Sequence, residues 1–231
     1  MPKRQFKAIF FDLDGTLVDI HGPLYTAVKK AMDDLGHTPP LTRERYWQAV
    51  AEDDRMIGVP EEMRRDFTKL AFAYFMIEVD GTERMEVLPH VYETLVLLKR
   101  RGYATGVITS RPGDPIVLMK KLSMVGLASQ LDQVVTQDTT SLLRALDKSE
   151  SLRETAKRAE VAPDLCMYVG DEPRDVMAAM NAGFGAAVAV ATGPATYEHL
   201  LTHPEYRPHF VMRSMNELLP LLTRFERGEI E

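Results

Sequence analysis

Short runs of hydrophobic residues alternate with longer amphipathic stretches over most of the chain. The first run, over residues 6–11, is compact and aromatic and gives way abruptly to Asp12. Such a run predicts a buried strand that leads into a polar loop. Later runs predict further strands over residues 104–109, 133–136, 167–169, 186–190 and 210–212.

Amphipathic stretches with helical spacing separate these predicted strands. They predict helices over residues 91–101, 115–125, 149–159, 174–182 and 215–222, after which residues 224–231 are expected to form a solvated tail. Strands that alternate with helices are typical of a mostly parallel sheet covered on both faces. The predicted fold class is therefore α/β, with ligands expected beyond the carboxyl ends of the strands.

Residues 20–85 differ from the rest because their apolar positions follow helical spacing throughout. Breaks rich in glycine and proline at residues 36–40 and 58–60 divide this stretch into three expected helices. The sequence thus predicts an α-helical domain over 20–85. It is inserted into an α/β core domain formed by residues 1–19 and 86–231.

Composition narrows the class of protein. Hydrophobic residues make up 45% of the chain, charged residues 27%, and the formal net charge is −6, a mixture typical of a globular protein. It gives no electrostatic reason to expect nucleic acid or an anionic membrane as a partner. The one cysteine, Cys166, excludes an internal disulfide and fits a reducing compartment. No apolar run has the length of a membrane span or a secretory signal, so we expect a cytoplasmic protein.

Two carboxylates follow the first predicted strand directly, Asp12 and Asp14, and Gly15 comes next. A pair of acids at one strand end can divide the work of group transfer. One attacks as a nucleophile, and the other donates a proton to the leaving oxygen and later takes one from water. The alternative is a turn in which both acids bind backbone amides.

A second acidic segment, with Asp171 and Asp175, follows the predicted strand 167–169. Acids in the first turn of a helix also suit the helix dipole, which offers a purely structural explanation. If the two strands are adjacent, however, these acids face Asp12 and Asp14 across the sheet edge. Four close carboxylates are strongly unfavourable without a cation. Because all the ligands are oxygen atoms, the sequence favours Mg²⁺ over zinc.

Hydroxyl groups and basic side chains near two further predicted elements complete the candidate site. Thr109, Ser110 and Arg111 end a strand, where hydroxyls and exposed amides can bind phosphate oxygens. Lys148 precedes a predicted helix, from which it could reach both a phosphate and a nucleophilic carboxylate. Each of these signals is weak without the acidic segments.

The order of these four motifs resembles the haloacid dehalogenase-like superfamily. Within it, the chain is similar to the phosphoglycolate-phosphatase-like and β-phosphoglucomutase-like group, whose members carry an α-helical cap. The resemblance covers residues 6–222 and is carried by DLDGT at 12–16 and GDEPRD at 170–175. It implies a Rossmann-like core, a cap formed by the helical insertion, and Mg²⁺-dependent phosphoryl transfer through an aspartyl-phosphate.

The resemblance also implies a role for each motif residue. Asp12 is the nucleophile and a metal ligand, and Asp14 is the general acid and base, with its backbone carbonyl facing the metal. Thr109 binds the transferring phosphoryl group, and Lys148 neutralises charge on that group and on Asp12. The second acidic segment supplies Mg²⁺ ligands, directly from Asp171 and directly or through water from Asp175. Such a set supports an in-line displacement.

One departure from the family pattern concerns Lys148. Relatives usually begin a Lys-Pro-x-Pro run at this lysine, whereas this chain has Lys148 followed by Ser-Glu-Ser, and Lys120 and Lys121 are poorer substitutes. Asp14 itself favours phosphate-ester chemistry, because members that dehalogenate carbon usually lack this second aspartate.

The leading functional hypothesis is a hydrolase that releases phosphate from a small soluble metabolite. The alternatives are a sugar phosphomutase, a C–P bond hydrolase that needs a cap lysine, and a binding protein without activity. The cap lysines are Lys29, Lys30 and Lys69. Cap side chains that could contact a leaving group are Arg43, Arg45, Arg55, Arg64 and Arg65. The sequence leaves the substrate and the oligomeric state open.

Overall fold

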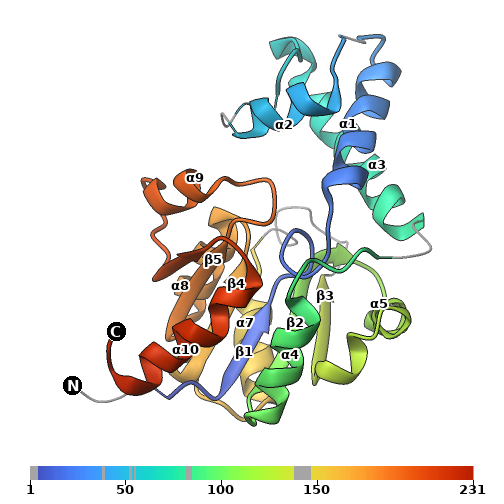
Figure 1. Cartoon of the computed structure of the whole chain (residues 1–231). Coiled ribbons are helices and arrows are strands. Elements are labelled where there is room, and N and C mark those ends of the chain that lie inside the picture. Colours follow the sequence, from blue (N-terminus) through green and yellow to red (C-terminus); the bar gives the residue numbers. More distant parts are fainter. Residues whose placement is uncertain are drawn as a thin grey trace.

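A computed structural model describes residues 5–37, 40–51, 54, 56–81, 85–137 and 147–230 of the chain. In Figure 1, a sheet with helices packed against it forms the lower part of the molecule, and a separate group of helices stands above it. None of the helices in these ranges combines the length and apolar character that a bilayer span requires.

The described strands form one six-stranded sheet in the order β3-β2-β1-β4-β5-β6, and every pair of neighbours is parallel. The strands are β1 (Ala8–Phe11), β2 (Ala104–Pro112), β3 (Gln133–Gln137), β4 (Cys166–Gly170), β5 (Ala186–Val190) and β6 (Phe210–Met212). β1 is central and its four residues are buried, as its unbroken apolar sequence predicts for a strand covered on both faces. The predicted α/β fold class is confirmed.

Helices cover both faces of the sheet. One face carries α4 (Val91–Arg100), α5 (Pro115–Met124) and α10 (Leu218–Arg227), and the other carries α7 (Ser149–Arg158), α8 (Pro173–Ala182) and the short α9 (Tyr197–Thr202). Because side chains alternate along a strand, Ile9 and Phe11 pack into the first layer, whereas Phe10 packs into the second. The 3₁₀ turns η2 (Ala128–Gln130), η3 (Pro163–Leu165) and η4 (Met215–Glu217) lie in the connections.

The expectation of a solvated tail over residues 224–231 is wrong. α10 continues to Arg227, and Phe225 is fully buried. Its ring centroid lies 5.1 Å from that of Phe6 and 5.4 Å from that of Phe210. The physical reason is that Phe225 extends the apolar stripe of Leu218 and Leu222 by one more turn, so the helix buries one face as far as this residue.

The upper group consists of α1 (His21–Asp34), α2 (Arg43–Ala51), the 3₁₀ turn η1 (Glu61–Met63) and α3 (Arg64–Gly81). These helices share a hydrophobic cluster of their own that includes Val28, Tyr46 and Phe67. The two segments that join this group to the core are hydrogen-bonded to each other, from Asp19 N to Glu86 O and from Leu88 N to Leu17 O. They leave the sheet near the carboxyl end of β1, so the helical group stands over the strand ends (Figure 1).

Candidate active site

The loop after β1 brings the first acidic segment against the second. Gly15 has a φ of +79°, and a Cβ atom there would lie 2.4 Å from Oδ2 of Asp171, so only glycine allows this turn and this approach. Thr16 donates a hydrogen bond from Oγ1 to Oδ1 of Asp171, at 2.9 Å. Two segments about 155 positions apart in the sequence are therefore in direct contact.

The second segment follows β4, which pairs with β1 so that Val169 lies opposite Phe11. Asp175 belongs to the first turn of α8, where its Oδ2 accepts a hydrogen bond from the backbone N–H of Glu172 at 3.1 Å. One oxygen of Asp175 therefore has a structural role, because it binds the backbone at the start of α8. Its other oxygen, Oδ1, accepts a hydrogen bond from Nζ of Lys148 and faces the site.

Asp12, Asp171 and Asp175 form a buried cluster in which one oxygen from each lies within 4.8 Å of the others. Burial raises the pKa of Asp12 to about 7, although the nearby ammonium of Lys148 acts in the opposite direction. Burial, together with the charges of Asp12 and Asp175, raises the pKa of Asp171 well above its usual value. Three buried oxygen donors that repel one another fit a hard divalent cation such as Mg²⁺.

Lys148 is buried between two of these acids. Its Nζ lies 2.6 Å from Oδ1 of Asp12 and 2.8 Å from Oδ1 of Asp175. Burial acts to lower the pKa of this lysine, but the carboxylates of Asp12 and Asp175 outweigh burial and raise the pKa well above its ordinary value. Lys148 is therefore the lysine that the structure places beside Asp12, whereas Lys120 and Lys121 lie on α5.

β2 continues beyond the predicted end at Thr109 and carries Ser110 and Arg111 into the same region. Thr109 is buried, and its Oγ1 accepts a hydrogen bond from the backbone N–H of Arg111 at 3.1 Å. The Oγ of Ser110 is buried and has no hydrogen-bond partner among the described residues. Both hydroxyl groups lie beside Asp12 and Asp14 in one cavity.

The sequence predicts that Arg111 binds substrate, and this stays a prediction. In the structure Arg111 lines the cavity and is bound to Asp14. Its Nε donates to Oδ2 of Asp14 at 2.8 Å, and its Nη2 donates to Oδ1 at 2.5 Å. The Asp14 carboxylate is therefore held by two parallel hydrogen bonds and lies outside the cluster of three acids. The contact between its backbone carbonyl and a metal stays a prediction.

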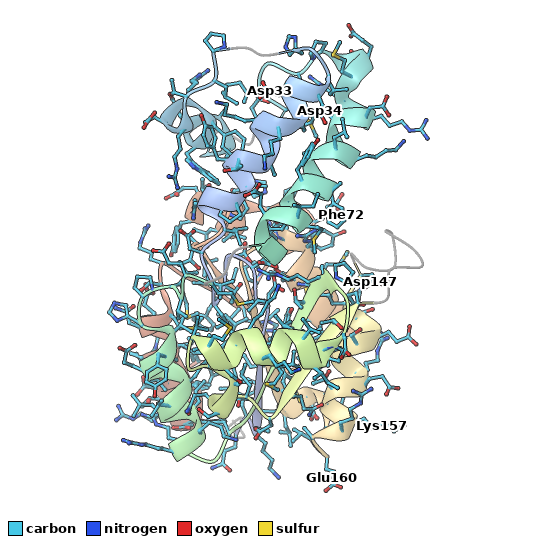
Figure 2. All side chains as sticks on the ribbon, turned by 90° about the vertical axis from the view of Figure 1, so that its right-hand side faces the viewer. Asp33, Asp34, Phe72, Asp147, Lys157 and Glu160 are labelled. Atoms are coloured by element: carbon cyan, nitrogen blue, oxygen red, sulfur yellow. The ribbon has the colours of Figure 1, made fainter. Side chains whose placement is uncertain are left out.

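A cavity of about 260 Å³ lies between the core and the helical group. The charged and hydroxyl-bearing residues on its core side are Asp12, Asp14, Thr109, Ser110, Arg111, Glu172 and Arg174. Its other side is largely apolar and includes Phe72, which lies on the part of α3 nearest the core in Figure 2. Sequence reasoning missed Glu172 and Arg174 as lining residues, although both belong to the second acidic segment.

The cap arginines proposed from the sequence do not line this cavity in the described chain. Arg43, Arg45, Arg64 and Arg65 are absent from its walls, and Arg55 lies outside the described residues. Helical periodicity alone did not indicate which face of each cap helix would be turned toward the core. It therefore could not separate these side chains from the apolar ones that line the cavity.

Comparisons with known proteins agree with this arrangement. The family model for haloacid dehalogenase-like hydrolases matches residues 9–189. Phosphoglycolate phosphatase 1 of Pseudomonas aeruginosa is 30% identical over 226 residues, which cover 93% of this chain and 79% of that protein. Pyrophosphatase PpaX of Bacillus velezensis is 29% identical over 223 residues, which cover 95% of this chain and 97% of that protein.

Solved structures show the same fold. A haloacid dehalogenase-like family protein from Streptococcus pneumoniae gives a TM-score of 0.68 at 19% identity and covers 94% of this chain and 98% of its own. A β-phosphoglucomutase from Clostridium difficile gives a TM-score of 0.64 at 18% identity, with 97% and 99% covered. Because the family model spans most of the sequence and includes both acidic segments, the chain belongs to the haloacid dehalogenase-like hydrolases.

Proposed function

We propose that this hydrolase is a Mg²⁺-dependent phosphatase that releases phosphate from a small phosphorylated metabolite through an aspartyl-phosphate on Asp12. The observation that carries the proposal is the position of the Asp12 carboxylate. It lies against Lys148 on one side and opens into the cavity that Asp14 also lines. The names of the relatives, phosphoglycolate phosphatase and pyrophosphatase, support phosphate chemistry.

In the first step, a carboxylate oxygen of Asp12 forms a bond to phosphorus while the bond from phosphorus to the leaving oxygen breaks. Asp14, in its protonated form and turned from Arg111 toward the leaving oxygen, donates its proton to that oxygen, so the product leaves as a neutral alcohol. Thr109 and Ser110 donate hydrogen bonds to the phosphoryl oxygens. Lys148 offsets negative charge on Asp12 and on the transferring group.

In the second step, Asp14 takes a proton from a water molecule, and the water oxygen bonds to phosphorus. The bond between phosphorus and Asp12 then breaks, which releases inorganic phosphate and restores the carboxylate. The two steps return both aspartates to their starting protonation states.

We infer that Asp12 and Asp171 hold Mg²⁺, with Asp175 in contact directly or through water. The bound ion supplies positive charge that offsets the phosphoryl oxygens and the crowded acids. Two features make these residues suitable for Mg²⁺: their oxygen donors are buried, and the backbone approaches Asp171 closely. A Cβ atom at Gly193 would come within 1.8 Å of Asp171 Oδ2, so only a glycine can lie against this acid there.

We further propose that residues 20–85 act as a cap domain over a core formed by residues 1–19 and 86–231. A separate hydrophobic cluster and a pair of hydrogen-bonded connections support this division. A cap in this position would exclude water during transfer and open for product release.

The C–P bond hydrolase is a weaker candidate, because no cap lysine lines the described cavity. Lys30 pairs with Glu78 at 2.5 Å, and Lys69 lies 3.6 Å from Asp66. Lys29 is exposed on α1. A sugar phosphomutase would use the same Asp12 chemistry. It differs from a phosphatase in its product, which is an isomeric sugar phosphate rather than inorganic phosphate.

The decisive experiment measures phosphate release from p-nitrophenyl phosphate with Mg²⁺ and with EDTA. We expect turnover only with the metal, and we expect Asp12→Asn to abolish it because the nucleophile is lost. The matched control is Asp33→Asn, which alters an exposed acid at the far end of the cap (Figure 2) and should keep full activity. Full activity in Asp12→Asn would refute the proposed mechanism.

A further inference from the structure

We propose that the apolar wall of the cavity selects phosphate esters whose organic group is an uncharged alkyl or aryl group. This inference rests on the proposed phosphatase function and names its substrate class. The part of the substrate that leaves from phosphorus would lie against the cap, while the phosphoryl group meets Asp12 on the core side.

Three side chains on α3 carry the argument, Phe72, Phe75 and Met76. All three line the cavity, yet none belongs to or packs against the hydrophobic clusters of the described chain. Phe72 is 37% exposed, and the other two are half-buried. They contribute little to the packing of the cap itself. Large apolar side chains grouped beside catalytic acids are typical of a binding wall.

The polar atoms of this wall offer little to a charged group. Its described cap residues include no lysine, arginine or histidine. Two residues of this wall carry a hydroxyl group, Thr68 and Tyr46. The hydroxyl of Thr68 already donates to the carbonyl of Arg64 at 2.7 Å, and Tyr46 also takes part in other interactions. A carboxylate or a second phosphate turned toward the cap would therefore lose water without gaining a cationic partner, which is strongly unfavourable.

The cations on the core side are also engaged. Arg111 is bound to both carboxylate oxygens of Asp14. Arg174 is paired in charge with Glu172, whose Oε2 lies 3.1 Å from Nε, although this buried Nε has no hydrogen-bond partner among the described residues. A second anion on the substrate would have to compete with these acids. The charge pattern therefore favours one anionic group, the phosphoryl group itself.

The volume of the cavity suits a substrate whose organic group is of moderate size. A cavity of about 150 Å³ is enough to hold benzene. The 260 Å³ found here accommodates a phosphoryl group and a ring or short alkyl chain. This substrate class differs from phosphoglycolate and pyrophosphate, the compounds in the relatives' names, because each of those carries a second anionic group.

The test compares kcat/KM over ethyl, butyl, hexyl and phenyl phosphate with kcat/KM for phosphoglycolate and pyrophosphate. We expect a rise of up to about fourfold for each methylene group that becomes buried, and a preference for phenyl phosphate over both doubly anionic compounds. Equal values along the alkyl series, or a preference for phosphoglycolate or pyrophosphate, would overturn the inference while leaving the phosphatase function intact.

Variants on α3 test the wall directly. Phe75→Ala should lower kcat/KM for phenyl phosphate about tenfold or more, and less for ethyl phosphate. Phe72→Lys, at a more exposed position, should shift the preference toward phosphoglycolate by supplying a partner for its carboxylate. Ile77→Ala is the control, because Ile77 lies on the same helix, is 59% exposed and does not line this cavity. Unchanged preferences in both Phe variants would also overturn the inference.

Calorimetric binding of phenylphosphonate and methylphosphonate separates this inference from the proposed function. Tighter binding of the phenyl compound, lost in Phe75→Ala, supports the apolar wall even if no ester is hydrolysed. Absence of hydrolysis for every ester would overturn the phosphatase proposal alone. Equal binding of the two phosphonates would overturn the wall.

Discussion

At the scale of single residues, the contact between Arg111 and Asp14 sets the geometry of the proposed acid and base. The guanidinium is a planar fork, and it binds both oxygens of the carboxylate at once. The Asp14 side chain is thereby fixed at the cavity wall before a substrate arrives. We therefore regard Arg111 as a positioning residue that acts through Asp14.

Arg111→Ala should lower kcat/KM by about 10- to 100-fold for an ester with a poor leaving group, because its oxygen needs the proton from a correctly placed Asp14. The loss should be smaller for p-nitrophenyl phosphate, whose leaving group needs little protonation. Arg111→Lys should restore only part of the rate, since an ammonium lacks the fork. Equal losses for both esters would show that Arg111 acts on the phosphoryl group instead.

At the scale of elements, the site depends on how closely the loop after β1 approaches the end of β4. Gly15, after β1, and Gly193, after β5, both lie against the Asp171 side chain, and Thr16 binds that side chain directly. Paired strands bring the three loops to one sheet edge, but the absence of two Cβ atoms allows the final contact. The exact path of these loops therefore matters more to the site than the strands themselves.

Gly15→Ala should lower kcat/KM by more than tenfold, because the new Cβ atom displaces Asp171. The matched control is Gly36→Ala, since Gly36 also has a positive φ, +66°, but no atom lies within 4 Å of the position that its Cβ would take. That variant should lose about 1–2 kcal/mol of unfolding free energy and keep its activity. Urea unfolding and steady-state kinetics on both variants test this. Equal activity losses would attribute the effect to backbone strain alone.

At the scale of the whole molecule, Mg²⁺ is expected to join parts of the core that are distant in sequence. Asp12 follows β1, whereas Asp171 and Asp175 follow β4, and all three are buried at one edge. Their mutual repulsion opposes folding, and the ammonium of Lys148 offsets part of it. A bound cation should therefore stabilise the folded state.

Saturating Mg²⁺, at about 100 times its dissociation constant, should add about 2.7 kcal/mol and raise Tm by about 5–10 °C over the EDTA-treated protein. Asp171→Asn should remove most of this rise. Asp66→Asn, an exposed acid on the cap, should keep it. A full Mg²⁺-dependent rise in Asp171→Asn, measured by thermal unfolding, would place the stabilising ion elsewhere.

Much of the core could be predicted because its signals are local. The short aromatic run before Asp12 is typical of a buried strand, and β1 lies within that run. The structure near the end of the chain was harder to predict from the sequence. Phe225 continues the apolar stripe of Leu218 and Leu222 but stands among charged residues, and its partners Phe6 and Phe210 come from distant parts of the sequence.

Hydrophobic periodicity and short motifs are local properties, so they were enough to predict the α/β fold, the helical stretch after the first strand and the two acidic segments. The partners of each side chain, in contrast, became visible only in the packed molecule. The packed structure binds Arg111 to Asp14 at the cavity wall, places Lys148 between two acids, and lines the side of the cavity formed by residues 20–85 largely with apolar groups. Such contacts join residues that are far apart in the sequence, and sequence separation does not indicate distance in space. The contacts therefore form only when the strands and helices pack.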